Sequence, residues 1–362
     1  MAEASRNHMS RENYAFAVLL FILGFLSLAW LIHLLVPNPL RLYAALRSEK
    51  IALLDGTNGK ICSAAFGSSH INDGFDPRAF DDELTATDRR SPTINLGIEG
   101  GSQTEQRAIA LEFLRRYAVR TGKLEQPCFV LLELNAGANF TPDHLIHPRA
   151  INIYDWSTMK FVNLLTDSRS SLRKAGRDGY ALTAMAMHYG NVGMLSSSIL
   201  KPPIDSTLLA DETRDGRRGL HSLPSTTPPL IYNEYASHPP ARSIPVPQNL
   251  TRGNYRLVQE LAETAADTHI HFVYVVFPLY SHLEHCPKYP DSIETPNGVE
   301  PILNIARPDL VPQLFEPRYW HDPGHLNSDG AALASRLLAD QLKTWYAAHG
   351  RDLSSGGQVA FR

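Results

Sequence analysis

The chain has 362 residues, of which 43% are hydrophobic and 20% are charged. This is the composition of a globular protein, and it excludes a disordered chain, a collagen-like fibre and a protein with many membrane spans. The formal net charge of −3 provides no field that would attract nucleic acid, so we expect no nucleic-acid partner. The three cysteines are too widely spaced for a disulfide framework or a CxxC metal site, and Cys62 and Cys128 are expected to be inert core residues.

The first feature along the chain is an apolar run from Tyr14 to Val36 that contains no formally charged residue. As a helix it is roughly 34 Å long, which is enough to cross the hydrocarbon core of a bilayer. A cleaved signal peptide is the alternative, but its apolar region is usually only about 7–15 residues long. We therefore predict a short tail over 1–13 and an uncleaved transmembrane anchor over 14–36.

Basic residues flank this anchor on both sides, so the positive-inside rule does not favour an exported body. We still expect the body to be outside the cytoplasm, because of the catalytic interpretation given below. A cytoplasmic domain is the alternative.

After a connector over 37–59, the rest of the chain alternates between apolar strands and amphipathic helices. Strands that are apolar on both faces and alternate with helices predict a parallel sheet that is covered on two sides. The expected fold is therefore α/β, a three-layer α/β/α domain over 60–349 with a mostly parallel sheet, followed by a flexible tail over 350–362. Strands are predicted over 60–66, 91–96, 127–134 and 269–278, and helices over 104–120, 257–268 and 328–349.

Residues 139–250 depart from this alternation. They contain predicted helices over 157–166 and 179–188 and then a proline-rich tract. We interpret this region as an insertion that extends one side of the site, and not as a separate domain.

The first candidate for chemistry is Ser69, in the run Gly67-Ser68-Ser69-His70 directly after the first predicted strand. Open α/β sheets bind their ligands at the carboxyl ends of the strands, and Gly67 permits a tight turn there. The alternative is a pair of serines that caps a helix.

The second candidate is the pair Asp322 and His325, three residues apart just before the last predicted helix. A carboxylate at this spacing can accept a hydrogen bond from one imidazole nitrogen while the other faces a serine hydroxyl. The alternative is a polar helix start, with Asn327 or Ser328 as its cap.

Two further segments offer hydrogen-bond donors for an oxyanion. Gly100 follows the second predicted strand, where a backbone N–H can approach a substrate carbonyl. Asn135 and Asn139 follow the third strand and carry side-chain amides, and we slightly prefer Asn135 because it is closer to the strand end. The alternatives are a tight turn and loop residues that cap their own backbone.

Taken in this order, the four segments resemble the blocks of the SGNH/GDSL hydrolase superfamily. Asp322 and His325 match the D-x-x-H block without change, and Ser69 takes the nucleophile position, with Ser68 in place of the family's Asp. Gly100 takes the second-block position at the end of an N-x-x-x-x-G run. The third block, G-x-N-D in the family, is met only in part by Gly137 and Asn139. The resemblance covers residues 60–139 and roughly 268–349.

The single predicted span makes the chain similar to membrane-anchored SGNH-like acyl esterases and O-acyltransferases of bacterial cell envelopes. The resemblance implies a bacterial inner-membrane protein with a periplasmic or extracytoplasmic domain. Such a protein transfers acyl groups to or from an envelope glycan, often beside a multi-span acyl donor protein. The substrate would be an acylated glycan or a small acyl ester.

Within this hypothesis, Ser69 is the nucleophile, His325 the general base and acid, and Asp322 the residue that orients the imidazole. Backbone N–H groups of Ser69 and Gly100 would bind the oxyanion, and no metal or cofactor is expected. An α/β-hydrolase is disfavoured because Ile71 stands where its G-x-S-x-G elbow needs glycine.

Two other hypotheses belong to different classes of protein. A catalytically silent SGNH-like scaffold subunit of a glycan-modification or export complex would explain the incomplete third block. A zinc site is the weaker hypothesis, suggested by histidines and a cysteine at short spacing: His269, His271, His282, His285 and Cys286.

Overall fold

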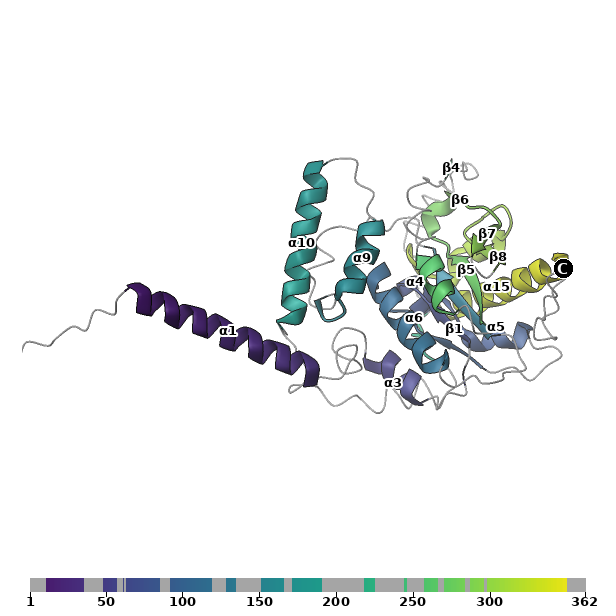
Figure 1. Ribbon diagram of the computed structural model, residues 1–362. Helices are drawn as coiled ribbons and strands as arrows, with labels where there is room; N and C mark the ends of the chain where they lie inside the picture. The colour runs from purple at the N-terminus through teal and green to yellow at the C-terminus, as the bar shows by residue number, and fades with distance from the viewer. Residues whose placement is uncertain are drawn as a thin grey trace, which may run out of the picture.

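The computed structural model of the protein describes residues 11–35, 48–56, 61, 63–84, 92–118, 128–134, 151–165, 171–190, 218–224, 244–245, 257–265, 270–283, 287–295 and 298–349. Within these residues the chain forms an α/β body with an apolar helix, α1 (Arg11–Leu35), that extends away from it (Figure 1). Among the described helices, α1 is the one that is long and apolar enough to cross a membrane, over Glu12–Leu35.

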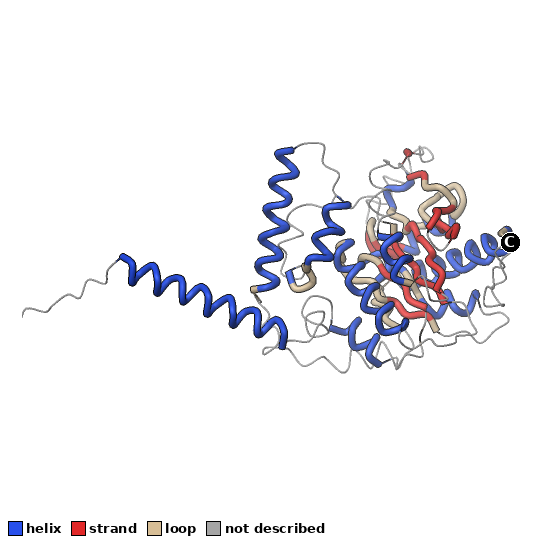
Figure 2. The backbone as a smooth tube through the Cα atoms, in the orientation of Figure 1, coloured by secondary structure: helices blue, strands red, loops and turns tan. Residues whose placement is uncertain are grey.

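The body is built on a six-stranded sheet with the strand order β2-β1-β3-β5-β8-β7 (Figure 2). All neighbours run parallel except β7 and β8, which pair antiparallel at one edge. The strands are β1 (Ser63–Phe66), β2 (Thr93–Asn95), β3 (Cys128–Glu133), β5 (Ile270–Val276), β7 (Ser292–Thr295) and β8 (Gly298–Asn304).

Both faces of the sheet are buried, as the apolar strand sequences require. Alternate side chains of β1, β3 and β5 enter two separate hydrophobic clusters. One cluster includes α3 (Ser48–Gly56), α6 (Gln103–Ala118) and the helical residues 257–264. The other includes α4 (Ser69–Gly74), α5 (Pro77–Leu84) and α15 (Ser328–Ala348).

The remaining elements are short or lie outside the sheet. The helices α9 (Trp156–Leu165) and α10 (Ser171–Tyr189) lie between α1 and the sheet (Figure 1). The ring centroids of His33 in α1 and Tyr189 in α10 are 4.8 Å apart. Short strands and 3-10 helices complete the body: β4 (Ile244–Pro245), η1 (Tyr280–Leu283), β6 (Pro287–Lys288), η2 (Pro312–Phe315), η3 (Pro317–Tyr319), β9 (Trp320–Asp322) and β10 (His325–Leu326).

The sequence located β1, β2, β3 and β5, the helices α6, α9 and α15 and the helix over 257–264, with ends that differ by a few residues from those predicted, and it placed the start of α10 eight residues too late. A helix after Ser69 was expected without an end, and neither α5 nor the β7–β8 hairpin was predicted. The segment 37–59, expected to be a connector, contains α3, whose Ile51 is fully buried in the core. Cys128, expected to be an inert core residue, is disulfide-bonded.

Residues 218–224, inside the predicted insertion, lie against the sheet domain. At one end, Asn95 N donates a hydrogen bond to Arg218 O, and His221 N donates one to Asn72 O. At the other end, Ser328 N donates to Leu223 O. Residues 218–224 therefore join β2, α4 and the start of α15.

The buried side chain of Asn95 ties the end of β2 to α4. Its Nδ2 donates to Ile71 O at 2.6 Å and to Phe75 O at 2.8 Å, and its Oδ1 accepts from Gly97 N at 2.9 Å. No other side chain in the described residues donates to these two carbonyls at the end of α4. The helix α4 is therefore held in place by a side-chain amide on the neighbouring strand.

We expect Asn95→Ala to lower the free energy of unfolding by about 1–3 kcal/mol, because it removes the buried side-chain donor to the carbonyls of Ile71 and Phe75 and the acceptor of Gly97 N. The measurement is chemical denaturation of the full chain in detergent. Asn304→Ala is the matched control, since Asn304 Oδ1, at the end of β8, accepts a single hydrogen bond from within the described residues, donated by Ala306 N. Equal losses in the two variants would contradict the role given to Asn95.

Candidate active site

The candidate site lies at the carboxyl edge of the sheet, where the strand order reverses. From β1 the chain continues to β2 on one side, and then to β3 on the other side of β1. Open α/β sheets bind ligands at such a switch point, because the two connections diverge and leave a crevice. Ser69 begins α4 just after β1, and Glu133 ends β3, so both lie at this switch point.

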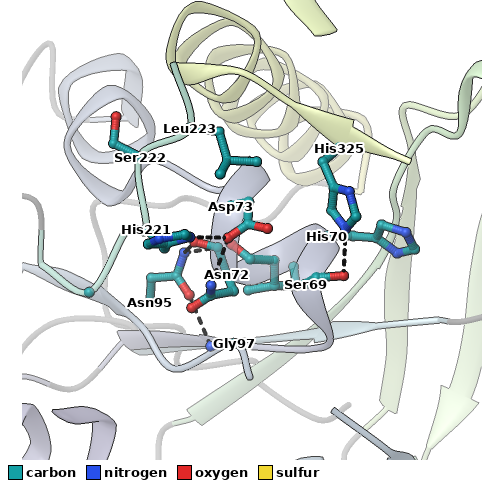
Figure 3. A network of polar contacts seen from close by, with 12 residues as sticks. Ser69, His70, Asn72, Asp73, Asn95, Gly97, His221, Ser222, Leu223 and His325 are labelled. Carbon is teal, nitrogen blue, oxygen red and sulfur yellow. Dashed lines mark hydrogen bonds and ion pairs between the residues drawn. The ribbon is translucent and has the colours of Figure 1, made fainter. Parts of the chain in front are cut away.

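The structure brings together the three residues that the sequence assigned to a triad. His325 Nε2 lies 2.9 Å from Ser69 Oγ, although the two residues are 256 positions apart in the chain (Figure 3). His325 Nδ1 lies 2.9 Å from both carboxylate oxygens of Asp322. A carboxylate only accepts, so Nδ1 carries a proton and Nε2 presents its lone pair to the serine hydroxyl.

A short antiparallel hairpin positions this histidine and its carboxylate. Asp322 ends β9 and pairs across from His325 in β10. Buried Trp320 anchors the hairpin, because its indole Nε1 donates to Leu314 O at 2.9 Å. The helix cap proposed as the alternative is also present, since the side chain of Asn327 caps α15 directly after the hairpin.

The pKa of Asp322 is lower than usual. Partial burial raises it, but hydrogen bonds from the His325 ring and from Gly324 N, together with the charge of His325, lower it further. Asp322 is therefore ionised at neutral pH, as a residue that orients an imidazole must be.

A second polar network surrounds Ser69, and the sequence did not predict it. Buried Glu133 accepts hydrogen bonds from Ser68 N at 2.6 Å, from Ser68 Oγ at 2.8 Å and from His70 Nδ1 at 2.8 Å. The two residues that flank Ser69 are thus held by one carboxylate. A single charged residue at the end of an otherwise apolar strand is the sequence feature that points to this role.

Charge and hydrogen bonding shift the pKa values of both Glu133 and His70. Burial raises the pKa of Glu133, but the charge of His70 and the hydrogen bonds from His70 and Ser68 lower it below its ordinary value. Burial lowers the pKa of His70, but the charge and hydrogen bond of Glu133 and the charges of Asp73 and Asp322 raise it above its ordinary value. The two residues therefore form an ion pair at mildly acidic pH.

The candidate oxyanion donors are placed only in part. Ser69 is the first residue of α4, and its backbone N–H donates to no other atom of the described residues. Gly100 is exposed and has a φ of 60°, in the turn after β2. Asn135 and Asn139 lie outside the described residues, so the third donor stays a prediction.

Gly97 is the glycine of this turn that packs directly against α4. A Cβ at this position would lie 2.4 Å from Asn72 N, so only glycine allows the turn to approach α4 this closely. Its N–H donates to Asn95 Oδ1 and serves the fold.

The residues of the zinc hypothesis fall partly outside the described residues, namely His269, His285 and Cys286. Of the others, His271 lies in β5, and His282 Nδ1 accepts a hydrogen bond from Leu279 N. In the described part of the chain, no three His, Cys, Asp or Glu side chains are grouped so that they could hold a metal ion.

No family model matches this chain, and neither a curated protein nor a solved structure matches it. The site is therefore interpreted from its own geometry. A hydrogen-bonded serine, histidine and aspartate at the carboxyl edge of a mostly parallel sheet define the arrangement used by serine hydrolases, which is recognised by geometry and not by position in the sequence.

We expect the Glu133–His70 ion pair to make stability depend on pH. The raised pKa of His70 adds stability that is complete below about 6.5 and is lost as the pH rises through its folded value. The lowered pKa of Glu133 adds stability that is complete above about 4.5 and is lost as the pH falls through its folded value. The contribution is therefore greatest between these limits.

His70→Asn keeps a donor for Glu133 and removes the charge. The Tm of this variant should lie further below that of the unsubstituted protein at pH 5.5 than at pH 9. His349→Asn, at the exposed end of α15, is the control for removing one histidine. A difference in Tm that is the same at both pH values would show that no ion pair forms.

Proposed function

We propose that the protein is a membrane-anchored, serine-dependent O-acyl esterase or O-acyltransferase that works through an acyl-Ser69 intermediate. The observation that carries the proposal is the hydrogen-bonded chain from Ser69 through His325 to Asp322. Serine is a weak nucleophile by itself, and it needs an adjacent base whose orientation is set by a third group. All three parts are present, and they lie on separate elements that meet at the edge of the sheet.

In the acylation step, His325 Nε2 takes the proton of Ser69 Oγ as this oxygen forms a bond to the carbonyl carbon of the ester. Asp322 stabilises the imidazolium that results. The Ser69 and Gly100 N–H groups are the proposed donors to the oxyanion. When the tetrahedral intermediate collapses, the bond to the alcohol oxygen breaks and His325 returns the proton to that oxygen.

In the second step, His325 takes a proton from the incoming hydroxyl, which attacks the acyl-serine. The proton then returns to Ser69 as the ester bond to the serine breaks. Water as the acceptor gives an esterase, and a sugar hydroxyl gives a transferase, with the same three residues in both cases. Glycans of a bacterial cell envelope are the proposed acceptor class, and a multi-span membrane protein is the proposed source of acyl groups.

The resemblance to SGNH/GDSL hydrolases supports this function and extends it to the fold. Serine after β1, glycine after β2 and D-x-x-H near the end of the chain stand in the order of that superfamily. Helices on both faces of a mostly parallel sheet agree with its three-layer α/β/α arrangement. We therefore propose an SGNH-like domain, with residues 139–250 as an insertion.

Two observations support an extracytoplasmic location at the bacterial inner membrane. The helix α1 is long and apolar enough to anchor the chain. Cys128 is disulfide-bonded, and disulfides persist mainly in oxidising compartments. The disulfide adds an argument for export that the charges around the anchor do not provide.

We expect a fluorophosphonate probe to label the full-length protein in detergent, because the probe reacts covalently with an activated serine. Ser69→Ala and His325→Ala should abolish labelling, and Asp322→Asn should slow it by about 10³–10⁴-fold, because the imidazole then takes the wrong tautomer. The measurement is in-gel fluorescence over a time course.

Ser281→Ala is the matched control, since Ser281 is an exposed serine on η1. Labelling that survives in Ser69→Ala would place the reactive serine elsewhere. A folded protein that is never labelled would favour the silent scaffold subunit.

For the location, we expect alkaline phosphatase fused after Arg362 to be active in an exporting bacterial host, since this enzyme folds only in an oxidising compartment. A β-galactosidase fusion at the same position is the reciprocal control and should be inactive. The opposite pattern would place the domain in the cytoplasm.

A further inference from the structure

The imidazole of His70 has one nitrogen that the fold does not use. Its Nδ1 lies 2.8 Å from Glu133 Oε1, and because a carboxylate only accepts, Nδ1 carries a proton. Within the described part of the chain, Nε2 has no hydrogen-bond partner, and the side chain keeps 20% of its surface exposed. A buried carboxylate thus fixes the ring and leaves one polar atom free at the edge of the site.

This free nitrogen lies beside the catalytic histidine. The ring centroids of His70 and His325 are 6.0 Å apart. Figure 3 shows the rings of His70 and His325 on the same side of Ser69, and Asn95 and Gly97 on the other side. His70 therefore lies beside the position that a substrate atom would take next to His325 Nε2.

The alcohol oxygen of the substrate has to occupy that place. One nitrogen of His325 takes the serine proton and returns it to the alcohol oxygen, so this oxygen must come within hydrogen-bond distance of it. A donor beside His325 faces the departing or attacking alcohol, and a donor near the Gly97 turn faces the carbonyl oxygen.

The ionisable groups around His70 favour its charged form. The carboxylates are Glu133 from β3, Asp73 from α4 and Asp322 from β9, and the other histidines are His325 from β10 and His282 from η1. Burial, followed by the charge of His70, lowers the pKa of His282 to about 4, so this neighbour is neutral at physiological pH. Only the protonated form of His70 carries a hydrogen on the free Nε2, and the three carboxylates stabilise that form.

We propose that Glu133 and His70 form a second histidine–carboxylate pair, in which His70 Nε2–H donates a hydrogen bond to the alcohol oxygen of the ester. This role rests on the proposed function and makes His70 a further catalytic residue. When the tetrahedral intermediate collapses, the electron pair of the breaking carbon–oxygen bond goes to the alcohol oxygen. That oxygen receives the serine proton from His325, while His70 keeps its own proton and stabilises the developing negative charge.

A donor of this kind matters in proportion to the charge on the alcohol oxygen. Alkyl alkoxides are strong bases and need the donor, whereas an aryl leaving group such as p-nitrophenolate carries its charge without help. Substrates that resemble sugar esters, with alkyl alcohols, would therefore depend on His70 far more than activated aryl esters.

The test compares p-nitrophenyl acetate with an alkyl acetate of a sugar, using the full-length protein in detergent. We expect His70→Asn to lower kcat/KM for the alkyl ester by about 100-fold and for the aryl ester by less than about 5-fold. Asn retains a donor for Glu133 and has no group at the position of Nε2. His349→Asn is the control and should change neither rate.

His70→Gln is a second variant, since its amide reaches the region of Nε2, and it should lose less alkyl-ester activity than His70→Asn. Melting of each variant shows whether it is folded. Equal loss for both esters would reduce His70 to a structural role, and no loss for either would show that it does not contact the substrate. Absence of fluorophosphonate labelling and of ester hydrolysis in the unsubstituted protein would overturn the proposed function itself.

Discussion

The buried carboxylate of Glu133 is the constraint on which the position of Ser69 depends. It lies at the carboxyl ends of the paired strands β1 and β3, where a Cβ on residue 67 would lie 2.1 Å from Ile71 Cγ1 and 2.5 Å from Glu133 Oε2, so the turn must contain glycine. The same carboxylate accepts hydrogen bonds from Ser68 N and Ser68 Oγ, and it thereby fixes the position of the residue before Ser69. The position of the serine is thus determined from the neighbouring strand, and not by the six-residue helix that it begins.

A negative charge in this position is costly unless donors surround it, because burial removes its hydration. The donors at Ser68 and His70 replace that hydration, and removing one of them would leave a buried charge partly unpaired. The second carboxylate of the site, Asp322, is half exposed and pairs with His325 on a surface hairpin. The two histidine–carboxylate pairs therefore differ in burial: one fixes the sheet edge, and the other stays accessible to solvent and substrate.

Much of this arrangement was predictable from the sequence, because strand ends and short spacings are local properties. Ser69 after an apolar strand, and Asp322 three residues before His325, were identified in this way. Long-range partners are not local, so the sequence did not show that Glu133 meets His70. The start of α4 was expected from its serine cap, but its end was not predicted, because six residues are too few for a periodic pattern. The disulfide of Cys128 was missed because spacing alone does not define a pair.

The 256 positions between Ser69 and His325 have a consequence for how the protein is made. Ser69 emerges early in synthesis and His325 emerges near the end, and α15 packs on α4 and α5 only after it has been synthesised. A nascent chain therefore carries Ser69 without its histidine partner for most of its synthesis. The hydrogen bond between Ser69 and His325 forms only when the last part of the chain docks on the sheet domain.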